Sequence, residues 1–172
     1  MKTLLIVDDE ADIREVIKDT LMNLGLQIDE AENGLEATKL LENKRYDAIL
    51  SDINMPKMNG IEFLKYIRSE NIPTPFVILT AYGDKDLAIQ ALKLGAFDFI
   101  DKPWQLENMV QTVLRALDLG FELNRWVAGG SELSGIAGLD SGATADESRL
   151  LKSLQLLSRE AQELRKKNEI KK

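Results

Sequence analysis

Five short apolar segments alternate with five amphipathic segments over about the first 125 residues of this chain. The apolar segments lie at residues 4–7, 27–31, 48–50, 76–79 and 97–100 and have the length of β-strands. When strands alternate with helices, right-handed crossovers place the helices on both faces of a parallel sheet. The alternation therefore predicts an α/β domain with a doubly wound, five-stranded parallel sheet and five helices.

The helices are predicted where apolar residues recur every three or four positions. The first ends at Gly25, where glycine commonly follows a helix. The last has apolar residues beyond Gly120 that favour its continuation to Trp126, although glycine costs a helix about 1 kcal/mol relative to alanine. The five predicted helices span residues 13–24, 34–41, 61–67, 87–94 and 106–117.

The composition changes after residue 126. Residues 1–126 hold 22 acidic and 14 basic side chains, whereas residues 127–172 hold 7 and 8. Five of the eleven glycines fall within residues 129–145, a composition typical of a linker. We therefore expect a globular domain at 1–126, a Gly/Ser-rich linker at 127–145 and an amphipathic, coiled-coil-like helix at 146–172.

The residue types that are missing narrow the chemistry. The 172 residues include no cysteine and no histidine, which excludes disulfides, thiolate nucleophiles, Cys- or His-ligated metals and the Ser-His-Asp triad. A net charge of −7 argues against general nucleic-acid binding. The sequence has no apolar run of membrane-spanning length and no signal-peptide pattern. We expect a cytoplasmic protein that works with carboxylates, hydroxyls and amines.

Reactive side chains fall at the ends of the predicted strands. Asp8 and Asp9 follow the first strand, Asp52 the third, Thr80 the fourth and Lys102 the fifth. In doubly wound sheets the reactive groups lie beyond the carboxyl ends of the strands. We therefore expect three carboxylates, a hydroxyl and an amine to meet at one edge of the sheet.

This group of side chains suits phosphoryl transfer. Clustered carboxylates repel one another, and a hard divalent cation with oxygen ligands, preferably Mg²⁺, relieves that repulsion. A central carboxylate can then attack phosphorus to form an acyl phosphate. The cation and an ammonium group would neutralise charge on the phosphoryl oxygens, and a hydroxyl would bond one of them. The residues thus predict transfer of a phosphoryl group to an aspartate, with Mg²⁺ as cofactor.

Four stretches resemble the receiver domain of two-component response regulators. They are residues 5–10 (LIVDDE), 52–60 (DINMPKMNG), 79–81 (LTA) and 95–103 (GAFDFIDKP). All four occur in the family's order and at its spacings, and the resemblance covers roughly residues 2–120. It implies a flavodoxin-like fold, with five parallel strands in the order 2-1-3-4-5 and five helices.

The resemblance also implies a role for each site residue. Asp52 is expected to accept a phosphoryl group from a sensor histidine kinase, a phosphotransfer protein or a small acyl phosphate. Asp9 is expected to bind Mg²⁺ directly and Asp8 partly through water, with Asp52 and the backbone carbonyl of Asn54 completing the protein ligands. Lys102 is expected to pair with the phosphoryl group, and with Asp52 before phosphorylation.

Two further residues are expected to form the family's switch. Thr80 would swing its hydroxyl toward the phosphate as the ring of Phe99 turns inward. Phe99 stands where the family frequently has tyrosine, so a switch that needs a phenolic hydroxyl is absent here. The resemblance also implies a cis peptide bond before Pro103. The output face would be formed by the fourth helix, the fifth strand and the fifth helix.

The C-terminal segment indicates how the signal leaves the domain. Thr144 and Glu147 fit a helix capping box. A seam with coiled-coil spacing follows, with Asn168 at its next core position. Dimerisation or partner binding, docking on the chain's own receiver and a frayed tail all remain open. The seam consists of Leu150, Leu154, Leu157, Ala161 and Leu164.

Taken together, the sequence predicts a phosphorylation-controlled switch. Its phosphorylation would change protein–protein interaction or dimerisation, without a DNA-binding output domain and without enzymatic activity beyond its own phosphorylation and dephosphorylation. Two alternatives stay open. One is a hydrolase that uses an aspartyl phosphate, although such enzymes commonly show Asp-x-Asp where this chain has Asp52-Ile53-Asn54. The other is a constitutive dimeric scaffold whose phosphorylation is incidental.

Overall fold

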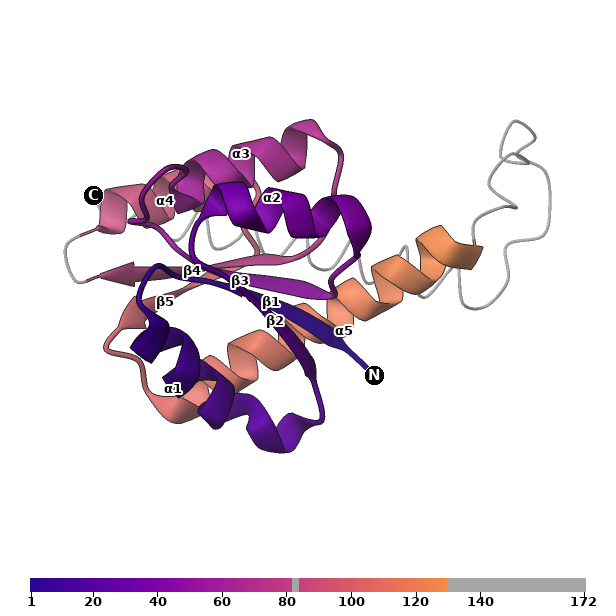
Figure 1. The fold of residues 1–172 in the computed structure, drawn as a ribbon, viewed down its shortest axis with the longest axis horizontal. Coiled ribbons are helices and arrows are strands. Elements are labelled where there is room, and N and C mark those ends of the chain that lie inside the picture. Colours follow the sequence, from indigo (N-terminus) through magenta and orange to yellow (C-terminus); the bar gives the residue numbers. More distant parts are fainter. Residues whose placement is uncertain (82–83, 130–172) are drawn as a thin grey trace, which may run out of the picture. The chain divides into compact units, whose positions relative to one another are not determined.

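The computed structural model describes residues 1–81 and 84–129. Within them, five strands alternate with helices along the chain (Figure 1). Each predicted strand is present. The first begins one residue earlier than the apolar pattern indicated, the third and fourth end two residues later, and the fifth begins one residue later and ends two residues later. The strands are β1 (Thr3–Val7), β2 (Gln27–Ala31), β3 (Ala48–Asp52), β4 (Phe76–Ala81) and β5 (Asp98–Lys102).

The helices also lie where the apolar spacing predicted them. The first predicted helix divides into α1 and a short 3₁₀ turn, η1, which ends before Gly25. Tightening into a 3₁₀ turn is a common way for an α-helix to end. The helices are α1 (Ala11–Leu21), η1 (Met22–Leu24), α2 (Gly34–Asn43), α3 (Gly60–Ser69), α4 (Lys85–Lys93) and α5 (Leu106–Gly129).

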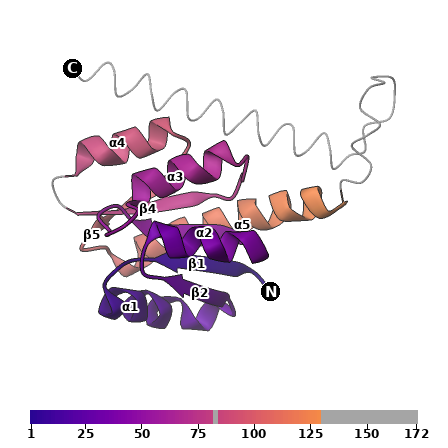
Figure 2. The same ribbon diagram turned by 45° about the horizontal axis from the view of Figure 1, so that its top comes forward.

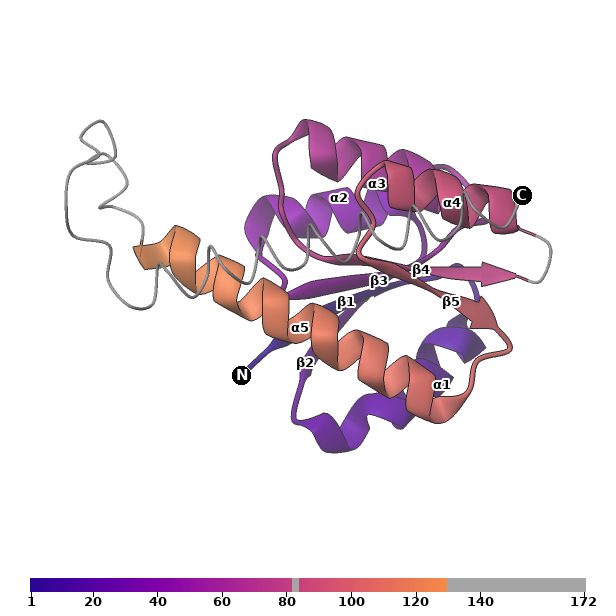
Figure 3. The same ribbon diagram turned by 180° about the vertical axis from the view of Figure 1, so that it is seen from behind.

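The strands form one parallel sheet in the order β2-β1-β3-β4-β5. Helices α2, α3 and α4 cover one face of the sheet, and α1 and α5 cover the other (Figures 1 and 3). The predicted doubly wound fold and its strand order are therefore confirmed. Because all strands run the same way, the carboxyl ends of β1, β3, β4 and β5 come together at one edge.

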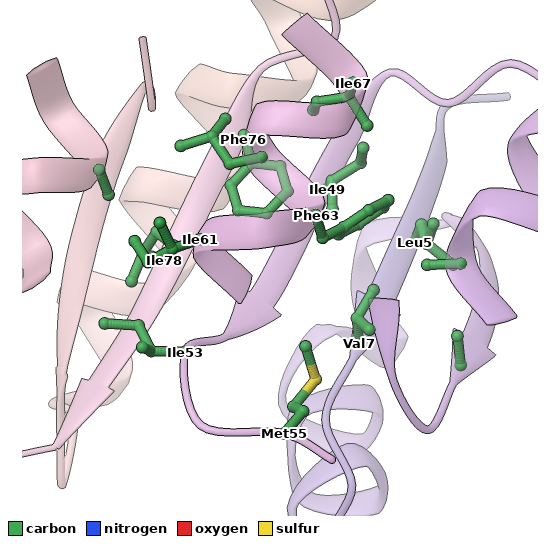
Figure 4. Close-up of a cluster of buried hydrophobic side chains, with 14 of the residues drawn as sticks. Leu5, Val7, Ile49, Ile53, Met55, Ile61, Phe63, Ile67, Phe76 and Ile78 are labelled. Carbon is green, nitrogen blue, oxygen red and sulfur yellow. The ribbon is translucent and has the colours of Figure 1, made fainter. Parts of the chain in front are cut away.

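Two apolar layers hold the sheet between its helices. Along β1, Leu5 and Val7 pack into the layer under α2, α3 and α4, whereas Leu4 and Ile6 pack against α1 and α5. Alternate residues of a strand point to opposite faces, so one short strand serves both layers. Figure 4 shows the first layer. In it, the rings of Phe63 and Phe76 pack edge to face, with their centroids 5.5 Å apart.

The start of α3 packs directly against the end of β3. Asn59 caps the helix: its side chain accepts from the backbone N–H of Glu62, and the Glu62 carboxylate accepts from the backbone N–H of Asn59. At Gly60, a Cβ atom would lie 2.2 Å from the backbone oxygen of Asp52. Only glycine permits this approach, which fixes the loop after Asp52.

The second half of α5 is fastened to the opposite, amino edge of the sheet. The side-chain amide of Asn124 donates to the backbone oxygen of Tyr46 (3.0 Å) and to Asp47 Oδ1 (2.8 Å). The other oxygen of the buried Asp47 accepts from the backbone N–H of Thr3 (2.7 Å). At Gly120 the helix passes so close that a Cβ atom would meet the Asp47 backbone oxygen at 1.6 Å. We call this group, Thr3, Asp47, Gly120 and Asn124, the α5 clasp.

The helix that contains Gly120 therefore continues past it, as the apolar pattern favoured, and residues 127–129 still belong to α5. Figure 2 shows α5 extending along the sheet from its start after β5. The remaining part of the predicted linker and the predicted C-terminal helix lie outside the described residues. In the described part of the chain, no helix is both long and apolar enough to cross a bilayer.

Candidate functional site

Three of the predicted site residues meet at the carboxyl edge of the sheet. Asp52 is the last residue of β3, Lys102 the last of β5, and Asp8 follows β1 directly. The ammonium of Lys102 lies 2.7 Å from Asp52 Oδ1 and 2.9 Å from Asp8 Oδ2. Both aspartates are buried, with Asp8 0% and Asp52 7% exposed. One lysine thus bridges two buried carboxylates that are 44 residues apart in the sequence.

Backbone amides orient the same two carboxylates. The N–H of Asn54 donates to Asp52 Oδ2 at 2.7 Å, and the N–H of Glu10 donates to Asp8 Oδ1 at 2.9 Å. Each aspartate therefore offers one oxygen to Lys102 and the other to an N–H two residues further along the chain. Charge-assisted bonds of this kind are among the stronger hydrogen bonds in proteins, so both carboxylates are held in fixed directions.

The electrostatics of the site follow from two negative charges and one positive charge. Burial raises the pKa of the Asp52 carboxyl, and this outweighs the hydrogen bond and charge of Lys102, which lower it. Burial would lower the pKa of Lys102, but its bonds to Asp52 and Asp8 outweigh that effect and raise it. Lys102 is therefore charged at neutral pH. Burial of Asp52 favours its neutral, protonated form over its ionised form.

Asp9 and Asn54 stand beside this buried group on the surface. Both are exposed, and the side-chain amide of Asn54 donates to Asp84 Oδ2 at 2.9 Å. Across residues 1–81 and 84–129, no three acidic side chains are already gathered as a metal site. The candidate metal ligands at this edge are nevertheless all oxygen atoms. The buried pair of Asp8 and Asp52 also carries more negative charge than Lys102 neutralises. That combination fits a hard divalent cation such as Mg²⁺.

The two predicted switch residues lie on neighbouring strands. Thr80 is buried near the end of β4, and its hydroxyl donates to the backbone oxygen of Ala81 at 3.4 Å. Phe99 on β5 is 37% exposed, so its ring is turned toward solvent. The predicted cis peptide bond between Lys102 and Pro103 is confirmed.

One residue at this edge was missed by sequence reasoning. Asp84 precedes α4 and makes the hydrogen bond to Asn54 across two loops. The available signal was an aspartate before a helix, which normally indicates an N-cap and nothing more. Its contact with a residue 30 positions away depends on how the loops after β3 and β4 are placed, which local sequence does not specify.

The fold and this edge define a class: a doubly wound α/β domain with a buried aspartate pair bridged by lysine at the carboxyl ends of its strands. A family model described as the response regulator receiver domain matches residues 4–114. The chain belongs to this family. Its members are regulatory domains of two-component systems, in which phosphorylation and Mg²⁺ binding are typical and histidine kinases or phosphotransfer proteins are the partners.

Curated relatives support the assignment over the same region. The response regulator protein PilR of Pseudomonas aeruginosa is 44% identical over 115 residues, which are 67% of this chain and 26% of PilR. The DNA-binding transcriptional regulator NtrC of Escherichia coli is 40% identical over 112 residues, which are 65% of this chain and 24% of NtrC. The chain thus matches about a quarter of the length of these relatives.

Solved structures agree with the fold. A response regulator receiver domain protein from Clostridium thermocellum has a TM-score of 0.66 and 30% identity, covering 72% of this chain and 99% of that one. The chemotaxis response regulator CheY4 of Vibrio cholerae has a TM-score of 0.62 and 33% identity, covering 67% and 98%. In both cases nearly the whole neighbour is matched.

Proposed function

We propose that this chain is a phosphorylation-controlled switch whose phosphoacceptor is Asp52. The observation that carries the proposal is the Lys102 ammonium bridging Asp52 and Asp8 at the carboxyl edge of the sheet. This arrangement presents one buried carboxylate as a nucleophile beside a fixed positive charge. The phosphoryl donor would be a sensor histidine kinase, a phosphotransfer protein or a small acyl phosphate.

Asp52, Asn54 and Lys102 would each have a different role in the phosphoryl transfer. An oxygen of Asp52 attacks the phosphorus of the donor, a new O–P bond forms, and the bond between phosphorus and the donor's leaving atom breaks. The backbone N–H of Asn54 keeps the Asp52 carboxylate in place. Lys102 already contacts Asp52 Oδ1, and its ammonium would turn to the phosphoryl oxygens as their charge arrives.

Asp8, Asp9, Asp52 and the backbone carbonyl of Asn54 would hold Mg²⁺. When bound, the cation supplies charge neutralisation on the transferred phosphoryl group. Asp8 and Asp52 would contribute buried negative charge to this metal site. Asp9 is exposed, so its carboxylate can change rotamer to reach the cation.

The signal would leave through the face made by α4, β5 and α5. The phosphoryl group on Asp52, which carries a charge of about −2, would draw the Thr80 hydroxyl away from the Ala81 carbonyl. The ring of Phe99 would then move from its exposed position into the space beside Thr80. This changes a face that already exposes Ile89, Leu92, Phe99 and Leu106. We further propose that the change alters dimerisation or partner binding through the C-terminal segment, without DNA-binding or enzymatic output.

The test is labelling by acetyl phosphate, followed by intact mass. Wild type with Mg²⁺ should gain the mass of one phosphoryl group, and Asp52→Asn should gain none. The matched control is Asp19→Asn, the same substitution at an exposed position near the end of α1, which should label like wild type. Undiminished labelling of Asp52→Asn would place the acceptor elsewhere, and labelling that is unaffected by chelation would remove Mg²⁺ from the proposal.

A further inference from the structure

Asn54 makes two hydrogen bonds that connect the phosphoacceptor to the start of α4. Its backbone N–H donates to Asp52 Oδ2 at 2.7 Å. Its side-chain amide donates to Asp84 Oδ2 at 2.9 Å. Asp84 is the residue that immediately precedes α4. A single exposed residue therefore contacts both the carboxylate that would be phosphorylated and the end of a helix on the output face.

Asp84 is held in a position where it does not cap its helix. In α2 and α3, the capping side chains of Asn33 and Asn59 accept backbone N–H groups of the first turn, at 3.1 and 2.9 Å. Asp84 precedes α4 in the same way, but its backbone (φ −90°, ψ 27°) is not extended as it is at Asn33 and Asn59, and its side chain makes no such bond in the described structure. Its carboxylate bonds to Asn54 instead. The first turn of α4 thus lacks an interaction that aspartate commonly supplies.

The other end of α4 is fixed more firmly. The half-buried guanidinium of Arg68 donates to the backbone oxygen of Gly95, just after the helix, at 2.9 Å. It also donates to the backbone oxygens of Ile72 (2.7 Å) and Thr74 (3.2 Å). These bonds join the end of α4 to the segment between α3 and β4. A change at the phosphorylation site is therefore expected to act on the amino end of α4, which the Asn54–Asp84 bond joins to the loop after β3.

We propose that Asn54 relays the phosphorylation state of Asp52 to α4 by holding or releasing Asp84, a relay that rests on the proposed function. A phosphoryl group on Asp52 places new acceptor oxygens and about −2 charge next to Asn54. The Asn54 amide turns to those oxygens, and the Asp84 carboxylate is repelled by them. Once its backbone turns to the extended conformation of a capping residue, the released Asp84 accepts a first-turn N–H group, that of Asp86 or Leu87, and caps α4.

The holding step is tested on the full chain without any phosphoryl donor. Amide hydrogen exchange of Asp86 and Leu87, resolved by NMR, is compared in wild type, Asn54→Ala, Asp84→Ala and the double variant. Asn54→Ala should slow exchange at these amides about fivefold, because the freed carboxylate caps the helix. The same substitution in the Asp84→Ala background should have no effect. Asn43→Ala, an exposed asparagine at the end of α2, is the control and should leave α4 unchanged.

The releasing step is tested with Mg²⁺ and beryllofluoride, a lasting mimic of the phosphoryl group. Wild type should show the slowed exchange of Asn54→Ala, and Asp84→Ala should not. Equal exchange in wild type and Asn54→Ala without beryllofluoride, or slowing that persists without Asp84, would overturn the relay. Acetyl phosphate labelling of the same samples separates the two proposals. Labelled protein with unchanged α4 exchange overturns the relay alone, whereas unlabelled protein overturns the proposed function and the relay's trigger with it.

Discussion

At the scale of single residues, the site is a balance between three charged groups. Asp8 and Asp52 lose most of their contact with water and share one ammonium, that of Lys102. Ionised Asp52 is destabilised by its burial, which is why its pKa is raised. The reactivity proposed for Asp52 would thus be obtained at the expense of folding stability, as is common for functional sites.

The raised pKa of Asp52 predicts how stability depends on pH. A carboxyl whose pKa is higher in the folded state binds protons more readily there, so its ionisation destabilises the fold as pH rises above the unfolded value of 3.8. Without Mg²⁺, Asp52→Asn should therefore be more stable than wild type at pH 7, where Lys102 keeps Asp8 as its partner.

The difference in the free energy of unfolding between Asp52→Asn and wild type should decrease as the pH falls to about 4 and below, where Asp52 becomes protonated in both the folded and the unfolded state. Urea unfolding of both proteins between pH 3 and pH 8 measures this difference. The Asp19→Asn variant, altered on the surface of α1, should show no such divergence with pH. A constant difference at all pH values would contradict the argument.

At the scale of secondary-structure elements, α5 shows where sequence patterns succeed and fail. The apolar spacing correctly predicts that the helix passes Gly120. Helix propensity alone treats this glycine as a defect of about 1 kcal/mol. In the fold it is a contact point, because the backbone of Asp47 occupies the space that a side chain would need. Propensity describes the isolated helix, whereas the clasp depends on a partner 73 positions earlier.

We therefore expect Gly120→Ala to destabilise the domain. The added Cβ, 1.6 Å from the Asp47 oxygen, would push α5 outward and stretch the two Asn124 hydrogen bonds. Overpacking of this kind costs about 1–3 kcal/mol, which exceeds the helix-propensity gain. The free energy of unfolding from urea titration measures it. Gln111→Ala, at an exposed position on the same helix, should change it little, and a stabilised Gly120→Ala would show that α5 has room to move.

The candidate site shows the same division between pattern and context. The strand ends indicated that Asp8, Asp52 and Lys102 could meet, because parallel strands bring their carboxyl ends together. The exposure of Phe99 and the Asn54–Asp84 hydrogen bond were not predictable from the sequence. The first depends on the rotamer of the Phe99 side chain, and the second on the conformation of the loops after β3 and β4. The functional roles of all the predicted site residues stay predictions; they are Asp8, Asp9, Asp52, Asn54, Thr80, Phe99 and Lys102.

At the scale of the whole molecule, the question is how the receiver acts on its surroundings. The family assignment covers residues 4–114, and the named relatives extend far beyond the matched region. The leucine seam predicted at residues 150–164 is too short to be stable alone, so it needs a second surface. Dimerisation with a second copy of the chain is one proposed use of that surface, and a foreign partner or the chain's own receiver are the alternatives.

Sedimentation with Mg²⁺ and beryllofluoride tests this expectation. The full chain should shift from monomer toward dimer on activation, while Asp52→Asn and a chain ended after Trp126 should stay monomeric. A dimer under all conditions that is lost on shortening would indicate the constitutive scaffold instead. Steady turnover of a simple phosphate ester by the same sample would favour the hydrolase.

The α5 clasp also bears on how the protein is made. Thr3 leaves the ribosome well before Asn124, which follows 121 positions later, yet both bond to Asp47. The sheet can assemble as its strands emerge, but its amino edge stays unfastened until α5 is nearly complete. A nascent chain of this protein therefore passes through an unlocked stage that lasts until Asn124 has emerged, during which a protease or chaperone has access to the amino edge of β1 and β3.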